Sequence, residues 1–313
     1  MKIVKYDKEY RAAWDDYIKT AKNYHFFFHR DYMEYHNDRF EDFSLLVYDE
    51  KQNIIAVLPA NRKDNILYSH QGLTFGGFLI DDKMKTETLL EVFEVLKGYL
   101  KEQGIEKIIY KCIPHIYYIK PSEEDRYALF RNDAKLIRRD VTSTIYLAEQ
   151  VRYSKGRKWA IQKSKKESIE TFESTDYESF WGLLTNVLAT NHDTKPVHTL
   201  EEIQKLASCF PKNIRLFLAR KDEHIVSGAL VYENQNIVHT QYLATSEKGK
   251  DLGALDLLID YLIKSVFNHK QYFDFGISNE DAGWHLNTGL IAQKEGFGAR
   301  AVAHDFYELE ISE

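Results

Sequence analysis

The chain is poor in cysteine. Among its 313 residues only Cys112 and Cys209 are present, far apart and without the spacing of metal ligands. Disulfide frameworks and zinc sites need closely patterned cysteines, so neither is predicted. We therefore expect reduced thiols, no metal centre and a cytoplasmic location.

Long apolar runs are missing as well. No window approaches the roughly 20 apolar residues of a membrane-spanning helix. The first residues, Met1–Asp7, contain no apolar region of the kind found in signal peptides. The sequence predicts no membrane span, and it fits a cytoplasmic step in a pathway whose product is exported later.

Several catalytic patterns are absent. There is no Ser-His-Asp order, no His-Glu-x-x-His, no cysteine pair and no Gly-Lys-Ser/Thr loop, which argues against hydrolases, zinc enzymes and P-loop proteins. Because the net charge is −6, a surface that binds DNA or anionic membrane throughout is not expected. The 44% of hydrophobic residues instead indicates an ordinary folded protein.

An internal repeat organises the chain. Asn65 and Asn236 begin strand-like runs and are 171 residues apart, and the same offset separates Ile54 from Ile225 in the preceding strand-like runs. The elements that recur in the same order are two strands, an amphipathic helix and a strand: Asn53–Pro59, Asn65–Gln71, Thr86–Gln103 and Ile105–Ile113, then His224–Val231, Asn236–Tyr242, Gly253–His269 and Tyr272–Ile277.

Both halves also open with helices. The expected opening elements are a strand at Met1–Tyr6, helices at Glu9–Ala21, Arg30–Asp38, Tyr177–Thr190 and Leu200–Phe210, and a strand at Ile214–Arg220. Helices and strands in this order predict an α/β fold with a mixed (α+β) sheet. Two copies are too few for a solenoid, so we expect two tandem lobes, residues 1–150 and 151–313, divided between Tyr146 and Ile169.

The segment Lys248-Gly249-Lys250-Asp251-Leu252-Gly253-Ala254 joins a predicted strand to a predicted helix. A basic, glycine-containing turn before a helix offers backbone N–H groups and a positive helix end to a phosphate. Alternatively, the glycines serve turn geometry and close packing alone.

This segment resembles the Gln/Arg-x-x-Gly-x-Gly/Ala phosphate loop of GNAT-superfamily acyltransferases, and Ala292–Phe297 resembles their C-terminal Tyr-x-Lys-x-Gly-Phe element. Two such lobes with a basic segment between them resemble the FemAB-like transferases of bacterial cell-envelope pathways. The pattern differs at Asp251, where the superfamily usually has a glycine, and at Ala292, where it often has a tyrosine.

The resemblance implies two tandem acyl-CoA N-acyltransferase-like (GNAT) lobes. It implies an acyl-CoA or acetyl-CoA donor, with strand His239–Thr245 splayed from its neighbour to receive the pantetheine arm. The implied donor-binding residues are Leu243, Lys248, Gly249, Lys250, Leu252, Gly253 and Ala254. FemAB-like members use aminoacyl-tRNA instead, so this donor stays open, as does a degenerate ligand-binding protein of the same fold.

Histidines lie in a polar segment between two expected helices. His192, Lys195 and His198 are suited to orienting an amine acceptor or taking its proton, because histidine titrates near neutral pH. The simpler interpretation is a capping segment, with Thr199 as the N-cap and Glu202 in the capping-box position.

Further polar residues lie on or after strands. Alternation places His239, Gln241 and Leu243 on one face, with His239 a candidate base or a satisfied core histidine. Asp274 faces away from Phe273 and Phe275 and is a candidate general base, or an aspartate held by loop amides. The expected acceptor-binding residues are Lys195, Gln241, Asn279, Asn287 and, in the first lobe, His70; Asn287 is alternatively a helix cap.

Residues 152–166 carry seven basic side chains and no acid. Such a run contacts phosphates of RNA or of a nucleotide-linked sugar, or it is a solvated helix face. The leading prediction is an N-acyltransferase acting on the amine of a small molecule, an amino sugar or an envelope precursor, without a metal. An aminoacyl-tRNA-dependent transferase is the second hypothesis.

Overall fold

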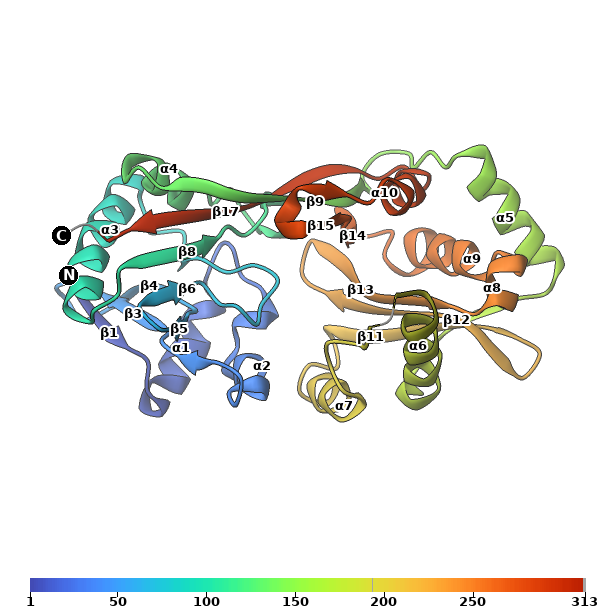
Figure 1. Cartoon of the computed structure of the whole chain (residues 1–313), viewed down its shortest axis with the longest axis horizontal. Coiled ribbons are helices and arrows are strands. Elements are labelled where there is room, and N and C mark those ends of the chain that lie inside the picture. The colour runs from blue at the N-terminus through green and yellow to red at the C-terminus, as the bar shows by residue number, and fades with distance from the viewer. Residues whose placement is uncertain (193, 312–313) are drawn as a thin grey trace. The chain divides into compact units, whose positions relative to one another are not determined.

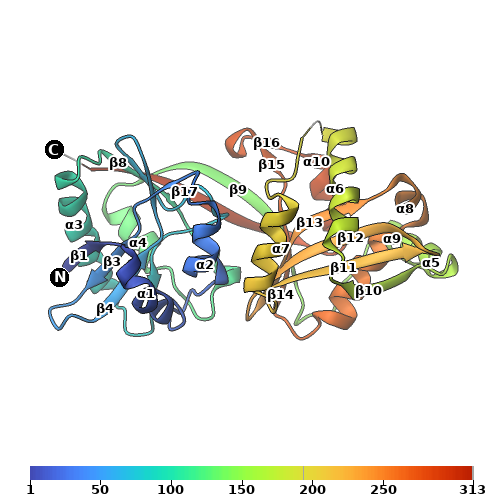
Figure 2. The same ribbon diagram turned by 90° about the horizontal axis from the view of Figure 1, so that it is seen from below.

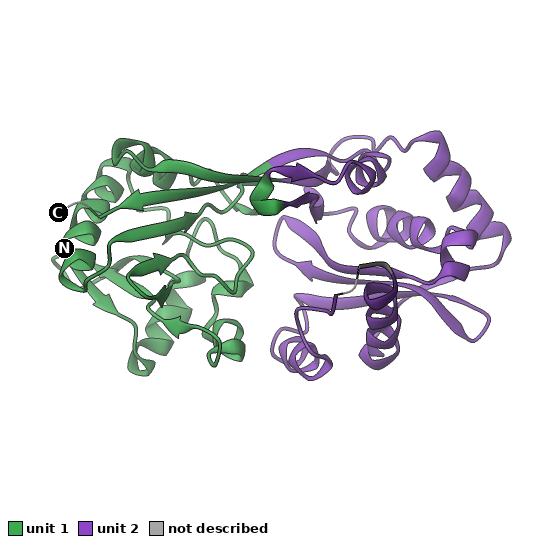
Figure 3. Cartoon of the chain, viewed as in Figure 1, with its two compact units in different colours: residues 1–140, 281–283, 303–313 green, residues 141–280, 284–302 purple. Residues whose placement is uncertain are grey.

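The computed structural model describes residues 1–192 and 194–311, with the backbone alone at 191 and 192. Contacts divide the chain into two compact units (Figure 3): residues 1–140, 281–283 and 303–313 form unit 1, and residues 141–280 and 284–302 form unit 2. Two strands, β9 (Lys135–Tyr146) and β17 (Arg300–Glu310), contribute residues to both units. The lobe boundaries expected from the sequence, residues 1–150 and 151–313, remain a prediction.

Unit 1 combines a four-stranded sheet and the end of a larger sheet with the α-helices α1 to α4 (Figure 1). Its further elements are β1 (Lys2–Lys5), α1 (Arg11–Ile18), α2 (Arg30–Met33), β2 (Glu41–Asp42), β3 (Leu45–Tyr48), β4 (Ile54–Leu58), β5 (Asn61–Lys63), β6 (Ile66–Tyr68), β7 (Leu79–Ile80), α3 (Thr86–Glu102), β8 (Lys107–Lys111) and α4 (Glu124–Arg131). One sheet has the order β1-β3-β4-β7, and the other runs β17-β8-β6-β5-β2.

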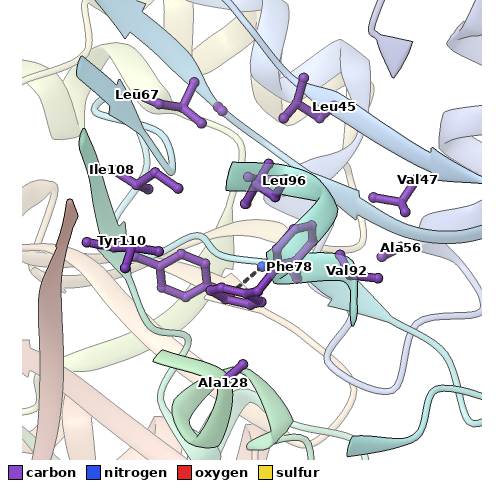
Figure 4. Close-up of a cluster of buried hydrophobic side chains, with 14 of the residues drawn as sticks. Leu45, Val47, Ala56, Leu67, Phe78, Val92, Leu96, Ile108, Tyr110 and Ala128 are labelled. Atoms are coloured by element: carbon purple, nitrogen blue, oxygen red, sulfur yellow. Dashed lines mark hydrogen bonds between the residues drawn. The ribbon is translucent and has the colours of Figure 1, made fainter. Parts of the chain in front are cut away.

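The core of unit 1 forms around α3. Its apolar residues recur at helical spacing, so that Leu89, Val92, Phe93, Leu96 and Leu100 lie on one buried face. Figure 4 shows this face among side chains from the strands of both sheets. Helix α3 therefore joins the two sheets into one core.

Unit 2 is built on the strands β10-β11-β12-β13-β14-β9, which follow one another in this order within an 11-stranded sheet. Its further elements are α5 (Lys155–Lys166), β10 (Glu170–Ser174), α6 (Tyr177–His192), α7 (Leu200–Cys209), β11 (Ile214–Lys221), β12 (His224–Glu233), β13 (Ile237–Thr245), α8 (Glu247–Leu252), α9 (Ala254–Tyr261), β14 (Tyr272–Ile277), β15 (Asn279–Glu280), β16 (His285–Leu286) and α10 (Thr288–Glu295). Strands β15 and β16 form a separate hairpin.

Helices cover both faces of this sheet. Figures 1 and 2 show α9 on one side of β11–β13 and α6 with α7 on the other. On the α9 side, Leu258 and Leu262 pack with Phe217 in the core. On the other side α6 approaches so closely that a Cβ at Gly228 would lie 2.4 Å from the ring of Phe180.

The two units repeat one feature of the predicted pattern. Strands β6 and β8 pair in parallel from Ile66 to Tyr68, and β13 and β14 pair in parallel from Ile237 to His239. The offset of 171 residues between the first strands is the one that the sequence predicts. The expected order of strand, helix and strand is thereby confirmed.

None of the helices in the described ranges has the length and apolar character needed to cross a membrane. Strands β9 and β17 and the short helix α8 are elements that the sequence did not predict.

Candidate functional site

The parallel strands β13 and β14 separate after three residue pairs. The last pair is His239 with Asp274, although β13 continues to Thr245 and β14 to Ile277. A pocket of about 530 Å³ lies beside this separation and is lined by Leu243, Thr245 and Phe275, among others. We call it the wedge pocket. The predicted splaying of His239–Thr245 from its neighbour is present.

A β-bulge at Gln241 changes which residues of β13 share a face. Tyr242 pairs with Leu230 and Thr240 pairs with Val231, which leaves Gln241 as the extra residue. His239 pairs with Tyr232 and Leu243 with Ala229, and residues three apart on a strand face opposite ways. The prediction that His239, Gln241 and Leu243 share a face is therefore wrong, because the bulge interrupts the alternation.

At the apex of the separation, His239 and Asp274 form a pair. The carboxylate of Asp274 is fully buried, and its Oδ2 lies 2.7 Å from Nδ1 of His239. Its Oδ1 accepts hydrogen bonds from the hydroxyls of Thr142 and Thr144 on β9. A carboxylate at Nδ1 assigns the ring proton to that nitrogen and makes Nε2 the basic one. This is the arrangement of an oriented general base.

Lys294 of α10 holds the end of β14. Its ammonium donates to the carbonyl oxygens of Gly276 at 2.9 Å and Ile277 at 2.7 Å. Burial lowers the pKa of Lys294 to about 8, although the charge of Asp274 acts in the opposite direction. Lys294 also lines the wedge pocket, so it links the pocket to the strand that carries Asp274.

The predicted phosphate loop is mostly helical. Residues Glu247–Leu252 form α8, capped by Ser246, and Gly253 in the left-handed region separates α8 from α9. Of the seven predicted donor-binding residues, Leu243, Gly249, Lys250 and Gly253 line the wedge pocket. Lys248, Leu252 and Ala254 belong to the same segment but lie outside that lining.

Both loop glycines are required by packing. A Cβ at Gly249 would lie 2.2 Å from the carbonyl oxygen of Val226, and one at Gly253 would lie 2.7 Å from that of Ala160. The alternative drawn from the sequence, that these glycines serve close packing, is therefore supported. It does not exclude a donor, because both residues also face the pocket.

The basic run forms α5, which packs on α9. Arg157 donates to the buried Asp256 near the start of α9 at 2.7 Å, and Lys163 donates to the carbonyl oxygen of Asp251 at 2.5 Å. A crevice of about 440 Å³ lies here, with Arg157, Lys163 and Lys250 in its lining. We call it the basic crevice; it shares Arg157, Lys250, Gly253 and Asp256 with the wedge pocket.

The histidine segment has a structural role. Thr199 and Glu202 form the predicted capping box of α7, and Nδ1 of the buried His198 lies 2.7 Å from the hydroxyl of Tyr242. Lys195 is exposed. His192 ends α6, and its side chain lies outside the described residues.

The remaining predicted acceptor residues are engaged within the chain. Asn279 accepts a hydrogen bond from the backbone N–H of Val141, and Asn287 caps α10, which confirms the helix-cap alternative. His70 is buried in unit 1, and burial lowers its pKa to about 3. Their acceptor roles stay predictions. The described residues contain no cluster of three or more His, Cys, Asp or Glu side chains that suits a metal ion.

Comparisons with known proteins bear on this geometry. Residues 153–282 match the family model of an acetyltransferase (GNAT) domain. No curated protein sequence matches the chain. The crystal structure of FemX has a TM-score of 0.71 at 12% identity and covers 99% of this chain and 97% of its own. The chain therefore contains a GNAT-type domain over residues 153–282, and its fold is like that of FemX.

Two further structures are similar to this chain in fold. L-PGS from Bacillus licheniformis has a TM-score of 0.59 at 11% identity, over 86% of this chain and 85% of its own. A tandem GNAT protein from the clavulanic acid biosynthesis pathway has a TM-score of 0.52 at 11% identity, over 100% and 99%. The predicted fold class is confirmed, and the GNAT domain supports an acyltransferase as the class of enzyme.

Three residues of this GNAT-type site were not nominated as site residues from the sequence. Lys294 lies inside the quoted segment Ala292–Phe297 and could have been found there. Thr142 and Thr144 left no signal, because their contact with Asp274 depends on the pairing of β9 with β14.

Proposed function

We propose that this protein transfers an acyl group from acyl-CoA to an amine, with the donor in the wedge pocket of unit 2. The observation that carries the proposal is the His239–Asp274 pair at the point where β13 and β14 separate. Neither side chain lines the wedge pocket. The pair lies at the end of the paired stretch from which the two strands that line the pocket separate, so we expect the reactive end of an inserted donor to reach it.

The lining of the wedge pocket suits an acyl-pantetheine arm. Leu243, Phe275 and Phe297 supply apolar surface. Past His239, the β14-facing backbone of β13 is available to pair with the amides of an extended ligand, as an added strand does. The adjoining basic crevice would receive the phosphate groups, since Arg157, Lys163 and Lys250 line it.

The chemistry follows from the pair. The amine nitrogen attacks the thioester carbonyl carbon and forms the amide bond, and Nε2 of His239 takes the proton that the amine loses. Asp274 stabilises the imidazolium. The carbon–sulfur bond breaks and the thiolate leaves. The imidazolium passes its proton to solvent water, from which the thiolate is protonated. Backbone N–H groups near Leu243 are suited to polarising the thioester carbonyl.

The acceptor class is an amine on a small molecule, an amino sugar or a cell-envelope or polysaccharide precursor. The FemAB-like fold supports this range. The wedge pocket would bind the donor and not the acceptor. Assays with different amines therefore identify the acceptor.

An aminoacyl-tRNA donor is the second candidate, favoured by one observation. The start of α9, where GNAT-type loops bind diphosphate, already carries the buried carboxylate of Asp256 and its partner Arg157. A negative charge at this end of a helix weakens the binding of a second anion there. The basic side chains of α5 would then contact the RNA backbone.

The proposal is tested by thiol release from acetyl-CoA in the presence of glucosamine or putrescine, after subtraction of the signal from the exposed Cys209. His239→Asn should lower turnover by about 10²- to 10⁴-fold, because the base is lost, while acetyl-CoA still stabilises the protein in a thermal-shift assay. His224→Asn, at the exposed first residue of β12, is the matched control and should keep full activity.

No stabilisation by millimolar acetyl-CoA, together with retention of aminoacyl-tRNA on a filter, would select the second candidate. Charge reversal at Lys158, Lys163 and Lys166 should abolish that retention. Binding of acetyl-CoA without turnover of any amine would indicate a degenerate binding protein.

A further inference from the structure

The two units differ at the place where the wedge pocket lies. In unit 2, β13 and β14 separate after the His239–Asp274 pair. The corresponding last pair of β6 and β8 in unit 1 is Tyr68 with Ile109. These side chains offer neither an imidazole nor a carboxylate, so the catalytic pair has no counterpart there.

The chain that follows β6 stays along β8. Ser69 donates its backbone N–H to Ile109, its hydroxyl accepts from the backbone N–H of Lys111 at 2.7 Å, and Gly76 donates back to the carbonyl oxygen of Lys111. A Cβ at Gly76 would lie 1.7 Å from the carbonyl oxygen of Ser69. Residues 69–77, which we call the unit 1 plug, thus fold back on themselves beside β8.

Lys111 fastens the plug. Its ammonium donates to the carbonyl oxygens of His70 at 3.0 Å and Leu73 at 2.8 Å, with a longer contact to Gln71. Gln71 is also paired with Asn61 through both its backbone and its side chain. Three carbonyl groups on one cation hold the loop more firmly than neutral contacts would.

The plug is also part of the core. Ser69, His70, Leu73 and Phe75 are all at most 4% exposed. Directly after it, Phe78 donates its backbone N–H to the hydroxyl of Tyr110 (Figure 4). Opening this loop would therefore expose apolar side chains and break buried hydrogen bonds, which is unfavourable.

We infer that the chain holds one acyl-donor site, in unit 2, and that the plug latched by Lys111 closes the equivalent place in unit 1. This inference rests on the proposed function for the identity of the donor, but the plug itself does not depend on it. His70 then belongs to the plug rather than to a substrate site.

Calorimetric titration of the full chain with acetyl-CoA tests the number of sites. We expect one site per chain, and its loss in Leu243→Trp, which fills the wedge pocket. Two sites, or one that persists in Leu243→Trp, would overturn the inference. If acetyl-CoA did not bind at all, it would not be the donor. The hydrogen-exchange experiment on the plug would then decide whether the inference holds.

Hydrogen exchange tests the plug without any donor. Amides of residues 69–77 should exchange at least about 10²-fold more slowly than those of residues 240–245 that face the wedge. Lys111→Met should accelerate exchange in the plug, whereas Lys107→Met, on the same strand but in an ion pair with Glu308, should not. Equal rates in the plug and the wedge, or no effect of Lys111→Met, would contradict the inference.

Discussion

At the scale of single residues, Lys294 gives a prediction that is independent of the proposed activity. A lysine whose pKa falls from 10.5 to about 8 on folding releases its proton earlier in the folded chain than in the unfolded one. Between these two values the unfolded chain binds more protons, so the contribution of Lys294 to the free energy of unfolding rises with pH. Below pH 8 both states are protonated, and this gain disappears.

Urea unfolding of unit 2 at pH 7 and pH 9.5 measures this effect. The wild-type chain should gain stability over this interval relative to Lys294→Met, which cannot titrate. Lys250→Met, at an exposed position in an ion pair with Glu247, should follow the wild type. If the free energy of unfolding changed equally with pH in Lys294→Met and in the wild type, Lys294 would not be buried as described.

Single residues could be nominated from the sequence, but their partners could not. His239 and Asp274 were each candidates because of their residue type and their place on apolar strands. Their pairing depends on the parallel register of β13 and β14, which matches His239 with Asp274. A shift of one residue would have pointed one of them to the other face.

At the scale of elements, the junction of α8, α9 and α5 gives the next prediction. Gly253 has φ +70, and a Cβ there would meet the backbone of α5. Gly253→Ala should destabilise unit 2 by about 1–3 kcal/mol. Gly182→Ala is the matched control, because this glycine lies within α6 with no atom within 4 Å of the added Cβ, and it should stabilise by about 0.5–1 kcal/mol.

Thermal unfolding tests both predictions, because the melting temperature should fall in Gly253→Ala and rise in Gly182→Ala. If Gly253→Ala melted at or above the wild-type temperature, the close packing of α5 on this junction would be refuted.

Helices and strands whose apolar residues recur at the spacing of that element could be predicted from the sequence. Elements without such spacing could not. Helix α3 and strand β14 were predicted nearly residue for residue, since each alternates apolar and polar positions at its own period. Strand β9 was missed because its first half, including Arg138, Arg139 and Asp140, is charged. The bulge at Gln241 also leaves no local signal, because it is defined by the pairing of β13 with β12.

At the scale of the whole molecule, the last strand of the chain completes the first unit. Residues Phe306–Glu310 of β17 pair with Lys107–Lys111 of β8, and Leu309 is buried in the core of unit 1. Asp305 accepts hydrogen bonds from Arg126 and Arg139. A repeat in the sequence predicts two lobes that are each continuous along the chain. It cannot show that β17 returns to pair with β8, which lies more than 150 residues earlier.

This return makes truncation a direct test. Removal of the residues after Val302 deletes one of the two strands that pair with β8 and leaves the backbone groups on that edge of β8 unpaired, which is unfavourable. We expect unit 1 to lose protection against proteolysis and hydrogen exchange, while the core strands β11–β13 of unit 2 remain protected. Truncation after Glu310, which keeps β17, is the control. Full protection of unit 1 in the shorter chain would show that unit 1 does not need β17.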